Sequence, residues 1–136
     1  MDIDALTRKI RGSLPGLMAV YLFGSRARGE ATRDSDLDLA VLMERRGDPL
    51  EFFYLAGELG AVAGCPIDLV DLRAASTVMQ YQVVTTGQVL WSRDFETGIF
   101  ESFVLSSKTE LDRARAALVE DITKEGRIRR EKIYAG

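Results

Sequence analysis

Two aspartates, Asp36 and Asp38, stand two positions apart where an apolar run over residues 37–43 begins. In a β-strand, residues two apart point to the same face, so both carboxylates would project together. Two ionised carboxylates at this spacing repel each other unless a cation lies between them. The pair therefore predicts a divalent-metal site, and carboxylate oxygens suit Mg²⁺. The alternative is that the two acids cap a turn and pair with nearby arginines.

A third acid, Asp68, lies within another apolar run, over residues 66–72. An unpaired charge inside such a strand would be costly. If this strand lies beside the one that carries Asp36 and Asp38, Asp68 completes the three carboxylates of a two-metal site. Asp71 is expected on the opposite side, near the strand end, and ranks second. For Asp68 the alternatives are a salt bridge or an edge position.

Gly24 and Ser25 directly follow an apolar run over residues 17–23 and open a turn. Without a Cβ, Gly24 allows the backbone to approach a ligand closely. Ser25 and the following amides can donate to phosphate oxygens. Charged donors that suit a triphosphate are added by Arg26, Arg28 and Arg33. Each of these arginines has the alternative role of a solvated loop charge.

Composition narrows the chemistry and the partners. Histidine is absent from the 136 residues, which excludes Ser-His-Asp and Cys-His catalysis and His-ligated zinc. The net charge of −3 gives no support for broad binding to nucleic acid or an anionic membrane. No apolar run approaches the ~20 residues that span a bilayer, and the lone Cys65 forms no intrachain disulfide. We expect one cytoplasmic domain, residues 1–136.

Hydrophobic spacing predicts alternating strands and helices around a small sheet, an α/β domain of the α+β type with a core over about 15–92. The expected strands cover 17–23, 37–43, 66–72 and 88–91. The first expected helix contains Ile3, Leu6 and Ile10 and is closed by Gly12 and Pro15. Two further helices are expected over 48–63 and 76–86, and one long amphipathic helix over about 94–125. Its stripe to bury comprises Phe100, Phe103, Val104, Leu111, Ala114, Leu118 and Ile122. If part of this stripe is exposed, we interpret it as an interface.

Aromatic residues in apolar surroundings are interpreted as core. Tyr21, Tyr54 and Tyr81 all sit in such patterns. Trp91 is expected to pack at the last strand, although an exposed aromatic ring there could stack on adenine. None of these residues is needed for the metal site.

The order Gly-Ser, ten residues, Asp-x-Asp and a later strand acid resembles the nucleotidyltransferase superfamily that includes DNA polymerase beta. The matching text is FGSRARGEATRDSDLD, followed by PIDLVDL. The short chain and the wording GSRARGEA…SDLDLAVL resemble the minimal nucleotidyltransferases, or MNT proteins, over roughly residues 15–92. The resemblance implies the polymerase-beta-like nucleotidyltransferase fold, a small mixed sheet flanked by helices, with a long C-terminal helix.

The resemblance also implies a reaction: in-line attack of a hydroxyl on the α-phosphate of a nucleotide, with pyrophosphate leaving. Asp36 and Asp38 would bind two Mg²⁺ ions and the triphosphate of ATP. Asp68 would bind the catalytic metal and help to deprotonate the hydroxyl. Gly24 and Ser25 match the phosphate-binding turn, and the resemblance extends less directly to phosphate contacts by Arg26 and Arg28.

Many MNT proteins are encoded beside a HEPN-domain protein and act as antitoxins, some by transferring AMP from ATP to a tyrosine of the toxin. The resemblance therefore implies a HEPN-domain toxin as partner in a hetero-oligomer. We expect no second domain large enough to bind an acceptor, which is compatible with a protein acceptor. The alternatives are a non-catalytic antitoxin that blocks its partner sterically and nucleotidyl transfer to a small molecule or an RNA end.

Overall fold

A small mixed sheet forms the centre of the computed structural model, which describes residues 1–32 and 35–135, with the side chains of the last helix described as far as residue 123. Within these ranges four strands lie in the order β3-β2-β1-β4. β1 pairs antiparallel with β2 and β4, and β2 pairs parallel with β3. The strands are β1 Leu17–Phe23, β2 Leu37–Met43, β3 Ile67–Asp71 and β4 Gln88–Ser92. The expected fold class is confirmed.

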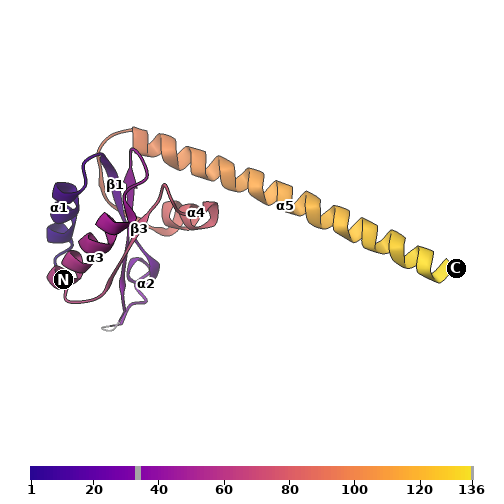
Figure 1. Cartoon of the computed structure of the whole chain (residues 1–136), viewed down its shortest axis with the longest axis horizontal. Helices are drawn as coiled ribbons and strands as arrows, with labels where there is room; N and C mark the ends of the chain where they lie inside the picture. Colours follow the sequence, from indigo (N-terminus) through magenta and orange to yellow (C-terminus); the bar gives the residue numbers. More distant parts are fainter. Residues whose placement is uncertain (33–34, 136) are drawn as a thin grey trace.

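Helices cover both faces of the sheet (Figure 1). α1 (Ile3–Ser13) and α3 (Pro49–Ala63) pack on one face, and α4 (Thr77–Thr86) and the first turns of α5 (Glu96–Ala135) pack on the other. The short α2 (Gly24–Ala27) follows β1 directly. The side chains of β2 alternate between these two apolar layers, as the period of two requires, whereas a register irregularity in β1 puts Met18 and Ala19 in the same layer.

Local chemistry sets the ends of the helices close to where the sequence predicts them. Asp48 caps α3 by accepting a hydrogen bond from the amide of Leu50 at 2.9 Å, and Gly64 ends the helix with φ 74°. Ser76 caps α4 by accepting from the amide of Met79 at 3.2 Å. β1 and β2 have the predicted bounds, β3 is one residue shorter at each end than predicted, and β4 is one residue longer.

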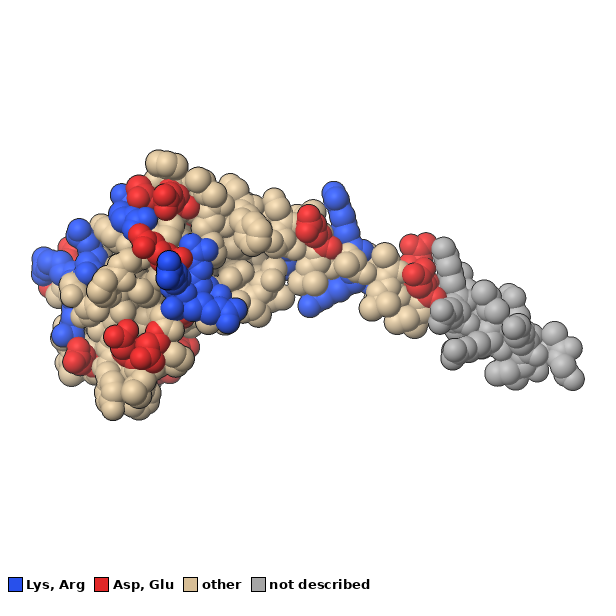
Figure 2. Space-filling view, turned by 45° about the horizontal axis from the view of Figure 1, so that its top comes forward, with Lys and Arg blue, Asp and Glu red and all other residues tan. Residues whose placement is uncertain are grey.

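The last helix departs most from expectation. α5 begins at Glu96 and leaves the domain as a projecting rod (Figures 1 and 2). Phe100 and Val104 are buried against the sheet as predicted, whereas Phe103 is 68% exposed. The expected burial of the whole stripe is therefore wrong for its outer part, where Leu118 and Ile122 are each 60% exposed. No helix of the described ranges has an apolar stretch that would cross a bilayer.

Two of the tyrosines also differ from expectation. Tyr21 lies in the core as predicted, but Tyr54 is 62% exposed and Tyr81 is partly exposed on the surface of α4. Trp91 is half-buried at the edge of the core, with the guanidinium carbon of Arg11 4.6 Å from its ring centroid. For Tyr54 and Tyr81, both on helices, an apolar sequence context therefore did not predict burial of the ring.

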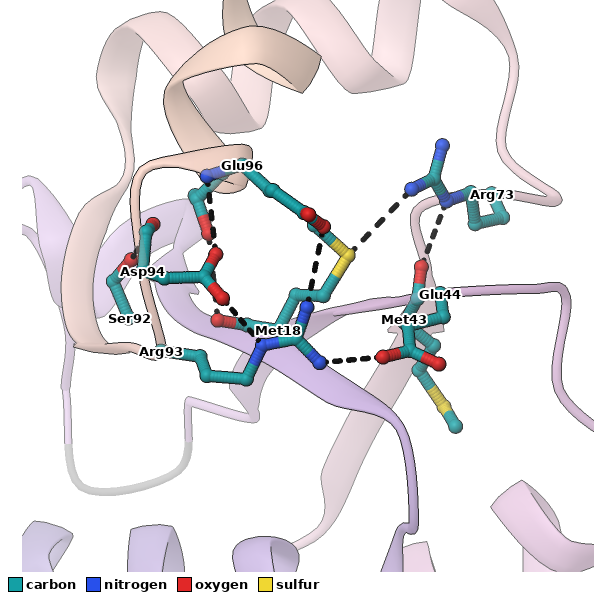
Figure 3. A network of polar contacts seen from close by, with 9 residues as sticks. Met18, Met43, Glu44, Arg73, Ser92, Arg93, Asp94 and Glu96 are labelled. Carbon is teal, nitrogen blue, oxygen red and sulfur yellow. Dashed lines mark hydrogen bonds and ion pairs between the residues drawn. The ribbon is translucent and has the colours of Figure 1, made fainter.

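A polar network fixes the start of α5 to the sheet (Figure 3). Arg93, which follows β4, donates from Nη1 to Glu44 at 2.6 Å and from Nε to Asp94 at 2.9 Å. Its Nη2 donates to Glu96 at 3.3 Å, and its amide donates to the carbonyl of Met18 at 2.8 Å. The ends of β1, β2 and β4 are thus tied to the first turn of the long helix.

A partly buried hydrogen bond anchors α5 one turn further on. The hydroxyl of Tyr21 in β1 donates to Oε1 of Glu101 at 2.6 Å. Burial, followed by the hydrogen bond and charge of Glu101, raises the pKa of Tyr21 well above its ordinary value. The phenol therefore stays protonated and remains a donor.

Replacing Tyr21 by Phe removes this donor and leaves the Glu101 carboxylate without it. Because hydrogen bonds to charged groups contribute about 1.5–3 kcal/mol, we expect a comparable loss in the free energy of unfolding, measured by urea denaturation. Glu101→Gln keeps an oxygen acceptor and should cost less. An unchanged urea midpoint for Tyr21→Phe would show that this bond does not anchor the helix.

Candidate active site

The register of β2 brings two of the three sequence-predicted acids together. Asp38 lies opposite Phe23 of β1 on one side and opposite Asp68 of β3 on the other. Ala40, two residues after Asp38, and Val70, two residues after Asp68, both pack in the layer under α4 and α5. Because strand side chains alternate, Asp38 and Asp68 project to that same face. Neighbouring strands thus present two carboxylates side by side.

Asp36 extends this acidic group from the residue before β2. It is exposed, and its charge contributes to a raised pKa of Asp38. The causes of that rise are burial first, then the carboxylate of Asp68 and then that of Asp36, while the charge of Arg28 opposes it. The carboxylate of Asp38 therefore feels the negative charge of both Asp68 and Asp36.

The donor chemistry of this group fits Mg²⁺. All three acids supply carboxylate oxygens, and their mutual repulsion is what a divalent cation would relieve. Among the described residues, no three acidic or cysteine side chains lie close enough together to coordinate one metal ion. The fit therefore depends on ligand type, shared face and the raised pKa of Asp38.

Gly24 lies against the central acid. It begins α2 with φ 73°, and a Cβ added to it would overlap the carboxylate of Asp38. Glycine is required here twice over, by its left-handed backbone and by the close approach. Ser25 follows half-buried, and its carbonyl accepts from the amide of Glu30 at 2.9 Å, which closes the turn.

The structure separates the two arginines that the sequence grouped together. Arg28 is exposed, pairs with Glu30 at 3.1 Å, and lies near enough to Asp38 to affect its pKa. Arg26 donates to the carbonyl of Ser35 at 2.8 Å and lines a cavity of about 300 Å³ with residues of α1, β1 and β2. Its Nε is buried with no hydrogen-bond partner in the described chain. Arg33 lies outside the described residues.

Asp68 lies at its predicted position, but one reason given for it does not hold. It is exposed on β3, an edge strand, so no buried charge requires compensation. The register opposite Asp38 is what makes it part of the group. Asp71 faces away, as expected, and accepts hydrogen bonds from the amides of Gly47 at 2.8 Å and Arg73 at 3.1 Å. It fastens the loop after β2 to the end of β3.

Sequence reasoning missed a groove beside Asp68. The groove has a volume of about 670 Å³ and runs between α3 and the outer edge of β3. Phe53, which is 72% exposed, stands at its rim and makes an edge-to-face contact with Tyr54, with ring centroids 5.8 Å apart. The sequence signal for this exposed ring was the adjacent pair Phe53 and Tyr54, because neighbouring residues of one helix cannot both face the core.

Replacing Gly24 by Ala tests the close approach to Asp38. Gly29 offers a matched control, because it also has φ 73° but open space around an added Cβ. We expect Gly29→Ala to cost about 1–3 kcal/mol of unfolding free energy from backbone strain alone. Gly24→Ala should cost measurably more, because the methyl group displaces the carboxylate. Equal losses in urea denaturation would mean that the contact with Asp38 is unimportant.

Comparison with known protein families agrees with this arrangement. The family described as polymerase beta nucleotidyltransferase matches residues 8–96, which include every element of the acidic site. A curated relative, the protein adenylyltransferase MntA of Shewanella oneidensis, is 37% identical over 122 residues. That match covers 90% of this chain and 88% of the relative.

Solved structures extend the similarity to the whole fold. A chain of a crystal structure of a toxin–antitoxin with AMP-PNP superposes with a TM-score of 0.82 at 35% identity, over 90% of this chain and 99% of that chain. A structure of tri-AMPylated Shewanella oneidensis HEPN toxin in complex with MNT antitoxin contains a chain that matches with a TM-score of 0.73 at 33% identity, over 88% and 94%. The chain therefore belongs to the polymerase beta nucleotidyltransferase family, as a minimal nucleotidyltransferase of the MntA type, and is an enzyme of that class.

Proposed function

We propose that this chain is a Mg²⁺-dependent protein adenylyltransferase that transfers AMP from ATP to a hydroxyl group of a HEPN-domain toxin and so acts as its antitoxin. A tyrosine is the proposed acceptor. The observation that carries the proposal is the register of β2, which sets Asp38 between the Gly24 turn and Asp68. Donor and acceptor groups would meet at that one position.

Each side of Asp38 has its own role in the proposed reaction. Asp36 and Asp38 would hold the metal ions together with Asp68. The turn at Gly24 and Ser25 leaves room for phosphate oxygens, with Arg28 as a nearby cation. Bound Mg²⁺ would neutralise charge on the triphosphate and on the attacking oxygen. The acceptor oxygen bonds to the α-phosphorus, the bond to pyrophosphate breaks, and Asp68 is placed to take the hydroxyl proton.

The relatives support the choice of donor and partner. The similar toxin–antitoxin structure was solved with AMP-PNP, an analogue of ATP. The HEPN toxin in the second similar complex is AMPylated. At 33–37% identity over nearly the whole chain, the same donor and the same class of acceptor are the simplest extension.

The face of the molecule shown in Figure 2 gives no support for an RNA acceptor. Lysine, arginine, aspartate and glutamate are interspersed over the face shown in Figure 2, without a continuous basic stripe among the residues described there. Backbone phosphates of RNA need such a stripe for affinity. A steric antitoxin without chemistry would have no use for the clustered carboxylates.

The first test is transfer of label from α-³²P-ATP with Mg²⁺ to the product of the gene next to the one that encodes this chain, which the proposal expects to be a HEPN-domain protein. Asp36→Asn/Asp38→Asn should slow transfer roughly a hundredfold or more, since single electrostatic contacts to reacting groups contribute on that scale. Asp4→Asn, at an exposed acid in the first turn of α1 and outside the acidic site, is the control and should retain transfer. Neutralisation of the toxin by the double variant would favour steric blocking, and label on RNA alone would refute a protein acceptor.

Metal binding gives a second test that needs no acceptor. Mg²⁺ with AMP-PNP at about 100 times its dissociation constant should stabilise the wild type by about 2.7 kcal/mol, measured by thermal unfolding. Asp38→Asn should lose most of this gain.

The pH dependence follows from the raised pKa of Asp38. Without metal, this shift stabilises the fold at pH values below the ordinary aspartate pKa, and the contribution is lost as the pH rises through the raised pKa. Asp38→Asn should therefore be at least as stable as wild type in metal-free buffer at neutral pH. Because protons compete with the cation, the stabilisation by Mg²⁺ should shrink as the pH falls toward that pKa. A Mg²⁺ effect that is unchanged in Asp38→Asn would contradict the assignment.

A further inference from the structure

The edge of the sheet beside the acids is open. β3 is the last strand in the order β3-β2-β1-β4, so it has a neighbour on one side only within the described residues. Asp68 belongs to this strand and lies opposite Asp38. The outer edge of β3 is therefore an unpaired sheet edge on the strand that carries Asp68.

The hydrogen bonds of β3 show which of its amides face outward. The amide of Leu37 donates to the carbonyl of Pro66 at 3.0 Å, and the amide of Leu72 donates to the carbonyl of Val41 at 3.0 Å. In a parallel ladder alternate residues of a strand bond to the same neighbour. Residues 66, 68, 70 and 72 therefore face β2, and the backbone groups of Ile67, Leu69 and Asp71 point outward.

The groove of about 670 Å³ follows this edge. Its walls include Phe53 and Ala56 of α3 on one side and Ile67 and Leu69 of β3 on the other, and Asp68 also lines it. Phe53 is 72% exposed. An apolar wall lies beside the outward backbone groups of Ile67 and Leu69, while the carbonyl of Asp71 already accepts from the amide of Ala74 at 3.1 Å. A wall of this kind beside an open strand edge matches what an extended polypeptide presents.

We propose that the acceptor protein docks by adding an extended segment to the outer edge of β3, with its apolar side chains in this groove and its acceptor hydroxyl beside Asp68. This docking proposal rests on the proposed function and states how the enzyme would recognise its acceptor protein. In an added strand, in either direction, the residue across from Asp68 projects to the same face as Asp68. The acceptor side chain would thus lie on the face of Asp38.

Charge favours a polypeptide in the groove over a nucleic acid. Two acids and one arginine, Asp68, Asp71 and Arg46, are among its lining residues, and the side chain of Asp68 projects to the face of Asp38. Phosphate groups would be repelled by the two acids, whereas a neutral backbone satisfies the outward amides. Asp71 already accepts two hydrogen bonds, which fixes the far end of the groove.

A second exposed apolar surface offers the rival docking site. Phe95, Ile99 and Phe103 lie on the same side of the start of α5 and line a cavity of about 450 Å³. These residues are separate from β3 and its groove. A partner that binds only there would leave the amides of β3 unchanged.

Hydrogen exchange of the full-length chain, alone and with the acceptor protein identified in the transfer test, distinguishes the two surfaces. The amides of Ile67, Leu69 and Asp71 should exchange readily in the free protein and become protected in the complex. Val70, whose amide faces β2, is the internal control and should change little. Protection confined to the first turns of α5 would overturn the proposal.

Kinetics with matched phenylalanine variants give an independent readout. Phe53→Ala should raise the KM for the acceptor protein roughly tenfold, because a buried aromatic anchor is lost, and should leave the KM for ATP unchanged. Phe103→Ala removes an equally exposed ring outside the groove and should have little effect. The opposite result, with Phe103→Ala raising the acceptor KM and Phe53→Ala not, would refute docking at β3.

The two proposals fail in different ways. Transfer by wild type that is lost in Asp36→Asn/Asp38→Asn but unchanged in Phe53→Ala would overturn the docking site and leave the adenylyltransferase intact. Absence of transfer by wild type would refute the enzyme proposal. The exchange measurement requires no chemistry, so with the protein tested for transfer it would still decide whether a partner strand binds β3.

Discussion

The pairing register of β2 is the constraint on which the site depends. β2 lies between β1 and β3, and Asp38 is paired with both. A slip of one residue would turn Asp38 into the layer under α1 and α3 and bring Leu37 or Leu39 to the acidic face. The apolar residues of β2 prevent that slip, because they fill both layers of the core. The hydrophobic core thus fixes the position of a charge.

The sequence was informative where local chemistry decides structure. β1 and β2 are continuous apolar runs with clear ends, and Asp48, Gly64 and Ser76 are cap residues, so these boundaries were predictable. Asp36 and Asp38 were predictable as acids at the start of β2 for the same reason, and their shared face stays a prediction. The pairing of Asp68 with Asp38 needed an assumption about strand order, which no local pattern contains.

The errors share one cause, which is that burial depends on what lies across from a residue. Asp68 was expected inside the sheet, but β3 is an edge strand. Tyr54 and the outer part of the α5 stripe are exposed. Helical spacing marks an apolar face, but it does not say whether another part of this chain covers that face. Phosphate contacts by Arg26 and Arg28 stay a prediction, but their partners differ, since Arg26 donates to the carbonyl of Ser35 and Arg28 pairs with Glu30. None of these neighbours is visible in a local window.

The strand order also bears on how an acceptor can reach the acids. A sheet receives a new strand only at its edges. One edge is β4, which is separated from β2 by β1, and the other is β3, which carries Asp68. The turn at Gly24 occupies the other flank of Asp38, since it directly follows β1. With the nucleotide proposed at that turn, the outer edge of β3 is the side from which an extended acceptor would approach without displacing the donor.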